Sequence, residues 1–113
     1  MKSVSGVVLY SKDLQRSIDF YEKLGFEFRK RDEAGATAYL NWFWIDVRAV
    51  STQHKAGYGP GQFIYIKVDD AKAAHKALVK KDLKPDGPPE PSDRGKLEFT
   101  LSDPDGYKLA FFD

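Results

Sequence analysis

The feature that most constrains the fold is a pattern of elements that occurs twice in the chain. In the first copy, Val4–Tyr10 is rich in β-forming residues, Asp13 follows, and apolar residues then recur at helical spacing until Gly25. In the second copy, Phe63–Val68 is again β-rich, Asp70 takes the place of Asp13, and a second helical pattern follows. A repeated unit of this kind predicts a fold built from two similar modules.

Helices are expected near residues 14–24 and 70–81. Asp13 and Asp70 suit the N-cap position, because a carboxylate there accepts hydrogen bonds from the free amides of the first helical turn. Gly25 suits the left-handed residue that follows a helix. The sequence therefore marks the start of each helix and the end of the first.

Short strands are expected to complete each module. In the first module they follow the helix at 26–30, 37–40 and 43–50, which gives the order βαβββ. In the second module a Pro/Gly-rich stretch replaces one regular strand, so the expected segments are the stretch 84–91 and the strands 97–101 and 109–112. The last two strands are joined at Asp103-Pro104-Asp105-Gly106, where Pro fixes φ and Asp-Gly tolerates positive φ.

The chain length limits how these modules are organised. At 113 residues there is room for one domain of normal size, so modules at about 1–50 and 62–113 are expected to form a single α+β domain, with a linker at 51–61. A chain this short builds only a shallow concavity, so we expect a homodimer in which a pocket is shared between two copies.

Alternation along the strands assigns side chains to the two faces of the sheet. The apolar set expected against the helices is Phe43, Ile45, Val47, Ile64, Ile66, Leu109 and Phe111. A tight turn at Asn41-Trp42 pairs Tyr39 with Trp44 on the opposite face. That face is rich in aromatic residues and carries a few charges, so it predicts either a ligand pocket or an interface between two copies. Its candidate binding residues are Tyr39, Trp44, Asp46, Phe63, Tyr65, Glu98 and Phe112.

Composition excludes several classes of function. The chain has 18 basic and 17 acidic side chains, which argues against nucleic-acid or membrane-surface partners. It has no cysteine, which excludes a disulfide scaffold, a thiolate zinc site and a cysteine nucleophile. With no apolar signal core or membrane-length apolar run, a soluble and cytoplasmic protein is expected.

Three segments resemble a known family. Asp13–Phe26, Val68-Asp69-Asp70 and Asp103–Lys108 are similar, in the right order, to the vicinal-oxygen-chelate superfamily, which includes glyoxalase I, extradiol dioxygenases, and fosfomycin and bleomycin resistance proteins. The resemblance covers essentially the whole chain. It implies two βαβββ modules that form a curved mixed sheet with the helices on its convex face. It does not imply one chemistry, because this fold hosts many functions.

The resemblance also implies where a metal would be held. The family's enzymes bind a divalent metal through four side chains, one from each of four strands. Three of these positions fall on Gly6, Phe63 and Ala110, which offer no donor atom, and only Asp46 lands on a ligand position with a carboxylate. One carboxylate is too few for a tightly held metal. We therefore expect no catalytic residue, metal or cofactor. The alternative is a glyoxalase- or dioxygenase-type enzyme with an atypical metal site at Asp46, Gln62 and Glu98.

The bleomycin-resistance branch implies a function without a metal. Its members are short two-module dimers that sequester a planar cationic drug between aromatic side chains. Residues 94–104 resemble its penultimate strand, although Arg94 stands where an aromatic residue usually precedes the glycine. The leading hypothesis is a metal-independent, homodimeric protein that binds an aromatic or cationic small molecule such as an antibiotic. An interaction subunit whose aromatic face is buried by its twin is a further alternative.

Individual polar residues have two interpretations each. Asp46 is expected to pair with Arg48 or with a ligand cation, and the alternative is a general base. Glu98 is expected to be a solvated or ion-paired strand residue, and the alternative is a second acid. His75 is expected to be partly packed in the second helix, and the alternative is a ligand role. His54 is expected on the linker surface, with a pocket rim as its alternative.

Overall fold

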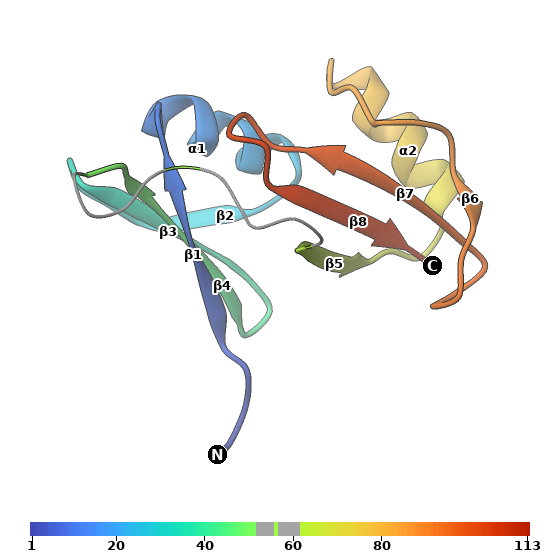
Figure 1. Ribbon diagram of the computed structural model, residues 1–113, viewed down its shortest axis with the longest axis horizontal. Coiled ribbons are helices and arrows are strands. Elements are labelled where there is room, and N and C mark those ends of the chain that lie inside the picture. Colours follow the sequence, from blue (N-terminus) through green and yellow to red (C-terminus); the bar gives the residue numbers. More distant parts are fainter. Residues whose placement is uncertain (52–55, 57–61) are drawn as a thin grey trace. The chain divides into compact units, whose positions relative to one another are not determined.

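The computed structural model describes residues 1–51, Ala56 and 62–113 (Figure 1). It divides into two compact units, Met1–Gly57 and Tyr58–Asp113, which are called the first and second module below. Each module contains one four-stranded mixed sheet and one helix. The α+β class and the repeated βαβββ order are therefore confirmed. Most of the expected linker at 51–61, including His54, lies outside the described residues.

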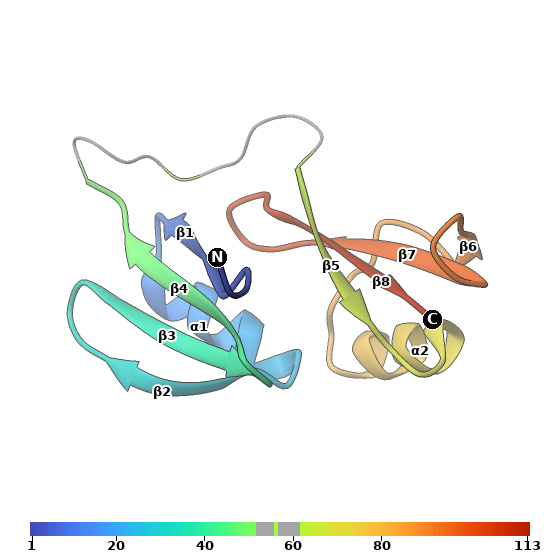
Figure 2. The ribbon, with the colours of Figure 1, turned by 90° about the horizontal axis from the view of Figure 1, so that it is seen from below.

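The first module follows the expected order. Its elements are β1 (Gly6–Ser11), α1 (Leu14–Lys23), β2 (Glu27–Arg31), β3 (Gly35–Leu40) and β4 (Phe43–Ala49). The sheet order is β1-β4-β3-β2, with β1 parallel to β4 and the other pairs antiparallel. Helix α1 packs on β4 and β2, and Figure 2 shows it on one side of this sheet.

Local hydrogen bonds explain where α1 begins and ends. The Asp13 carboxylate accepts from the amide of Arg16 at 3.2 Å, which is the expected N-cap. Gly25 has φ of +99°, a conformation that suits glycine after a helix. Between these ends, Ile18 and Tyr21 are buried, and the Tyr21 ring meets Phe26 edge-on at 5.7 Å between centroids. The helix is therefore anchored at both ends and along one apolar face.

The second module repeats this arrangement. Its elements are β5 (Phe63–Lys67), α2 (Ala71–Lys80), β6 (Glu90–Pro91), β7 (Leu97–Ser102) and β8 (Lys108–Phe112). The sheet order is β5-β8-β7-β6, with β5 parallel to β8, and α2 packs on β7 and β8. The Pro/Gly-rich stretch ends in the two-residue strand β6, which pairs with β7. No helix of the described residues is long and apolar enough to cross a membrane.

Two aspartates hold the second module together. The Asp70 carboxylate caps α2 by accepting from the amide of Ala73 at 3.1 Å. The Asp113 carboxylate accepts from the amide of Ala71 at 3.0 Å and from that of Leu97 at 2.9 Å. One side chain thus joins the start of the helix to the start of β7.

The turn between β7 and β8 has the expected conformation. Gly106 has φ of +92° and its amide donates to the Asp103 carbonyl at 3.0 Å.

The register agrees with the expected faces. Ile45, Val47, Leu109 and Phe111 are buried, whereas Phe43, Ile64 and Ile66 are only half-buried. The difference has a physical reason. Strand β5 lies at the edge of its sheet, so Ile64 and Ile66 have a neighbouring strand on one side alone, and Phe43 lies beside the Asn41-Trp42 turn.

Candidate ligand-binding faces

The first module has a helix-free face, called the first face below, on the side of its sheet opposite to Ile45 and Val47. The expected pairing is confirmed, because Tyr39 lies opposite Trp44 across β3 and β4. In the next row along the strands, Asp46 has Thr37 on one side and Val8 on the other. Tyr39, Trp44 and Asp46 are therefore brought together, as the sequence predicted.

Trp44 covers Gly6. The two residues are paired across β1 and β4, and a Cβ atom built on Gly6 would overlap the indole ring of Trp44. The indole thus occupies the space into which any side chain at position 6 would extend. Gly6 is the position at which the resemblance places the family's first metal ligand. A donor side chain there and the present indole position exclude each other.

Asp46 has partners within its own sheet. Its carboxylate accepts a hydrogen bond from the Thr37 hydroxyl at 3.0 Å, and the same oxygen lies 3.7 Å from Nη1 of Arg48. The side chain is 21% exposed. The expected pairing with Arg48 is therefore present, and the hydroxyl of Thr37 further fixes the carboxylate. These contacts describe a positioned carboxylate at the edge of an aromatic wall.

The second module has the corresponding helix-free face, called the second face below. The ring of Tyr65 lies 6.1 Å from that of Phe63 and 6.1 Å from that of Phe112, measured between centroids. Phe63 is 42% exposed and Tyr65 is 39% exposed. Ala110 is fully buried and lies between Tyr65 on β5 and Thr100 on β7. The three predicted aromatic residues thus form one continuous cluster.

Basic side chains stand over these rings. The Arg94 guanidinium carbon lies 4.1 Å from the centroid of Tyr65, and the Lys67 amine lies 5.2 Å from that of Phe112. In the first module, the Arg29 guanidinium carbon lies 4.9 Å from the centroid of Tyr39. Such pairs are attracted by the ring quadrupole. The faces expected to attract a ligand's cation are therefore already partnered by cations of the chain.

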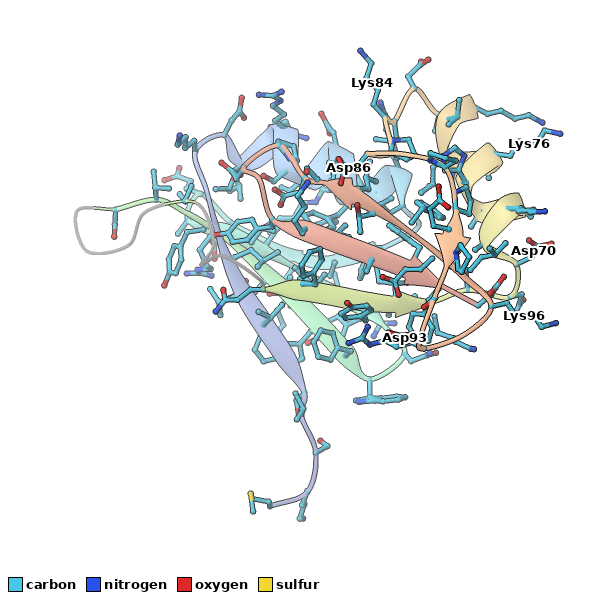
Figure 3. The ribbon with its side chains drawn as sticks, turned by 45° about the vertical axis from the view of Figure 1, so that its right-hand side comes forward. Asp70, Lys76, Lys84, Asp86, Asp93 and Lys96 are labelled. Carbon is cyan, nitrogen blue, oxygen red and sulfur yellow. The ribbon has the colours of Figure 1, made fainter. Side chains whose placement is uncertain are left out.

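Glu98 and Asp86 are acids with hydrogen-bonding partners on and beside the second face, and Glu90 lies opposite Glu98 across β6 and β7. The Glu98 carboxylate accepts from the Ser92 hydroxyl at 2.9 Å. The Asp86 carboxylate, labelled in Figure 3, accepts from the Thr100 hydroxyl at 2.6 Å and from the Lys108 amine at 2.9 Å. Burial acts to raise the pKa of Asp86, but the hydrogen bonds from Thr100 and Lys108 and the charge of Lys108 together hold that pKa below its ordinary value. Both carboxylates therefore have partners within the module.

A cavity of about 300 Å³ lies at the edge of β7. Its lining residues, from β7, β6 and the segment that leads into β6, are Asp86, Gly87, Pro88, Glu90, Glu98, Phe99 and Thr100. His75 lies next to this segment. Its Nε2 is 3.1 Å from the Gly87 carbonyl oxygen, and its ring meets Phe99 edge-on at 5.1 Å. His75 is thus the partly packed helix residue that the sequence predicted.

The residues at the implied metal positions do not fit a metal. Gly6, Phe63 and Ala110 carry no donor atom, and Trp44 fills the space at Gly6. Within residues 1–51, 56 and 62–113, no three His, Asp or Glu side chains are grouped so that they could hold an ion. Metal ions are bound through several such groups arranged around one point. The arrangement suits stacking and charge pairing instead.

Sequence reasoning missed two of the cations over the rings, Arg29 and Arg94. Alternation along the strand places Lys67 on the same face as Phe63 and Tyr65. It gives no such signal for Arg29, where the pairing of β2 with β3 is irregular, or for Arg94, which lies in a loop. The contact between Trp44 and Gly6 needed the pairing of β1 with β4, which alternation within one strand does not provide.

Comparison with models of protein families shows which family the chain belongs to. The model of the Glyoxalase/Bleomycin resistance protein/Dioxygenase superfamily matches residues 3–111. The chain belongs to this superfamily. The resemblance inferred from the sequence is therefore confirmed at the level of the superfamily.

Solved structures show the same fold. The chain is similar to a glyoxalase/bleomycin resistance protein/dioxygenase from Nocardioides, with a TM-score of 0.81, 16% identity, and coverage of 98% of this chain and 82% of that one. It is similar to lactoylglutathione lyase from Agrobacterium tumefaciens, with a TM-score of 0.77, 14% identity, and coverage of 98% and 92%. A superfamily member from Sphaerobacter thermophilus gives a TM-score of 0.76, 22% identity, and coverage of 98% and 96%. At these identities the likeness concerns the fold alone. Among curated proteins no significant match is found.

Proposed function

We propose that this superfamily member is a metal-independent binding protein that holds an aromatic small molecule and does not convert it. The observation that carries the proposal is the indole of Trp44 over Gly6. At the position where the resemblance places a metal ligand, this chain has an aromatic ring. The loss of donors and the gain of a stacking surface occur at the same place.

The chemistry of the two faces supports an aromatic ligand. Trp44 and Tyr39 are neighbours on the first face, and Phe63, Tyr65 and Phe112 form the cluster on the second. Aromatic side chains bury large apolar areas and favour offset or edge-on contacts with another ring. Phe63 and Tyr65 are exposed by about 40%, so a ligand would remove apolar surface from water.

The proposal includes the homodimer expected from the chain length. The exposed aromatic residues of the second face supply apolar area for a groove shared by two copies. Sequestration of a drug such as an antibiotic is the biological use that the resemblance implies. A cationic ligand is less favoured than a neutral or anionic one, because Arg94 and Lys67 already stand over the rings of Tyr65 and Phe112.

A neutral aromatic probe tests the proposal. Isothermal titration with 2-naphthol, with and without a chelator, is expected to give the same dissociation constant, and elemental analysis is expected to give far less than one divalent ion per chain. Trp44→Ala is expected to weaken binding about fivefold or more, which corresponds to about 1 kcal/mol of lost stacking. Trp42→Ala is the matched control, because Trp42 is 69% exposed in the β3–β4 turn.

Two results would contradict the proposal. One is the absence of binding by any aromatic probe, whatever its charge. The other is one bound metal per chain together with a glyoxalase or ring-cleaving activity that a chelator abolishes. The second result would favour the alternative, a metal-dependent enzyme. It would mean that the first metal ligand comes from a residue at a position other than 6.

A further inference from the structure

Arg94 is held at a defined place by its own loop. It follows Asp93, labelled in Figure 3, in the loop between β6 and β7. The Arg94 amide donates to the Ser92 hydroxyl at 3.1 Å. The next residue is Gly95, where a Cβ atom would overlap the backbone carbonyl of Asp113. The loop therefore passes close to the end of the last strand at a position that only glycine allows.

The Arg94 guanidinium lies over the ring of Tyr65. Its central carbon is 4.1 Å from the ring centroid, which is a cation–π contact. No hydrogen bond or ion pair joins its side chain to another residue in the described part of the chain. A guanidinium has its donors in one plane, so a stacked guanidinium still presents them to an acceptor at its edge.

Two cations stand over the aromatic cluster. Lys67, over Phe112, adds a second positive charge to the same face as Arg94. Of the nearby acids, Asp86 is paired with Lys108, whereas Glu98 and Glu90, which lie opposite each other across β6 and β7, keep their negative charge. Asp93 precedes Arg94 in the chain and is exposed. Within the described residues neither Arg94 nor Lys67 forms an ion pair, so an anionic group on the rings can pair with both cations.

We infer that Arg94, positioned by Tyr65, is the receptor for the carboxylate of a planar aromatic acid. The inference rests on the proposed function and names the class of ligand that the second face binds. The carboxylate accepts two parallel hydrogen bonds from the guanidinium edge, a pairing that matches the geometry of both groups. The ring of the ligand packs on the exposed ring of Phe63, whose centroid lies 6.1 Å from that of Tyr65. A cationic ligand is repelled by Arg94 and Lys67.

A series of probes with one ring and three charges tests this inference. The probes are 2-naphthoate, 2-naphthol and 2-naphthylmethylamine, titrated by calorimetry at constant ionic strength. The wild-type protein is expected to bind the acid most tightly and the amine least tightly. Arg94→Gln is expected to weaken 2-naphthoate about tenfold or more, because a charge-assisted pair is lost, and to change 2-naphthol by less than about twofold. Arg94→Lys keeps the charge without the planar guanidinium. Its dissociation constant for 2-naphthoate is expected to lie between those of the wild-type protein and the Arg94→Gln variant.

Arg31 provides a matched control. It is also an exposed arginine over an aromatic ring, that of Phe28 at 5.7 Å, but it belongs to the first module and pairs with Glu22 of α1. Arg31→Gln removes the same charge and is expected to leave 2-naphthoate binding unchanged. A second variant, Tyr65→Leu, keeps Arg94 but removes the platform, and is expected to weaken 2-naphthoate as well. Amide chemical shifts of residues 63–67 and 92–96 are expected to move on titration with the acid, and thermal denaturation checks that each variant is folded.

Each contrary result has a separate meaning. Equal binding of acid and alcohol, or equal loss in the Arg94→Gln and Arg31→Gln variants, would overturn the role of Arg94 and leave the proposed aromatic binding intact. Tighter binding of the amine than of the acid would also overturn the inference. Failure of all three probes would overturn both the inference and the proposed function.

Discussion

The indole of Trp44 lies over the α-carbon of Gly6, its partner across the parallel pair β1 and β4. Any side chain at position 6 would overlap the indole. The relationship couples two properties of the protein, because the space that a metal-binding side chain would need is the space that the stacking ring fills. It also makes Gly6 a packing residue.

The first prediction concerns this contact. Gly6→Ala is expected to lower the free energy of unfolding by about 1–3 kcal/mol, because the added methyl group must displace a packed indole. The loss is expected to be smaller when Trp44 is replaced by Ala as well, so the double-mutant cycle gives a coupling energy. Urea denaturation measures each value.

Gly87→Ala is the control for that cycle. A Cβ atom on Gly87 would meet nothing within 4 Å. Its effect on stability is therefore expected to be near zero or slightly favourable, since alanine restricts the unfolded chain more than glycine does. An equal loss for Gly6→Ala with and without Trp44 would contradict the packing explanation.

The second prediction is a dependence of stability on pH through Asp86. Hydrogen bonds from Thr100 and Lys108 outweigh burial and lower the pKa of Asp86 in the folded state. The Asp86 carboxylate therefore contributes its full stabilisation at pH values above the unfolded pKa of about 3.9. This stabilisation is lost as pH falls through the lower pKa of the folded state. Asp86→Asn should remove this part of the acid sensitivity. The pair with Lys108 is exposed, so the effect at neutral pH is expected to be below about 1 kcal/mol.

Urea titrations at several acidic pH values measure the Asp86 effect. Asp93→Asn is the control, because Asp93 is exposed and forms no ion pair in the part of the chain that the structure describes. The explanation would be wrong if the two variants showed the same pH dependence as the wild-type protein.

The third prediction concerns the Asp113 carboxylate. Its pKa is lowered first by the hydrogen bond from the amide of Ala71 and then by that from Leu97. As for Asp86, the stabilisation is lost as pH falls through the folded pKa. Asp113→Ala is expected to lower the denaturation midpoint and to speed hydrogen exchange at the amides of Ala71 and Leu97. Unchanged exchange at both amides would show that the carboxylate does not join α2 to β7.

The fourth prediction is the homodimer. Light scattering at micromolar concentration is expected to give about twice the mass of the chain, with an interface that buries more than about 1,000 Å² in total. Phe63→Ser, which removes an exposed ring from the second face, is expected to weaken association if this face takes part in the interface. A wild-type protein that stays monomeric at this concentration would contradict the prediction.

Much of the fold was determined by local sequence. Asp13 and Asp70 cap the two helices and Gly25 follows the first, because capping depends on residues within one turn of each other. The pairing of Tyr39 with Trp44 was also predictable, since the short turn between them sets the register of the hairpin. The face assignments followed from alternation, with the exception of the incomplete burial of Phe43, Ile64 and Ile66 at a turn and an edge strand.

The tertiary structure decided what occupies the two faces. Gly6 meets Trp44 only because β1 and β4, which are far apart in the chain, pair in parallel and in one register. Arg94 reaches Tyr65 because the loop between β6 and β7 passes beside Asp113. The loop can pass there because residue 95 is glycine, and a Cβ atom at that position would overlap Asp113. The sequence by itself determined the elements, the superfamily and the loss of metal donors, since these depend on residue type and short-range spacing. The contact of Trp44 with Gly6 in the first module and that of Arg94 with Tyr65 in the second arise from long-range pairing, which no local pattern specifies.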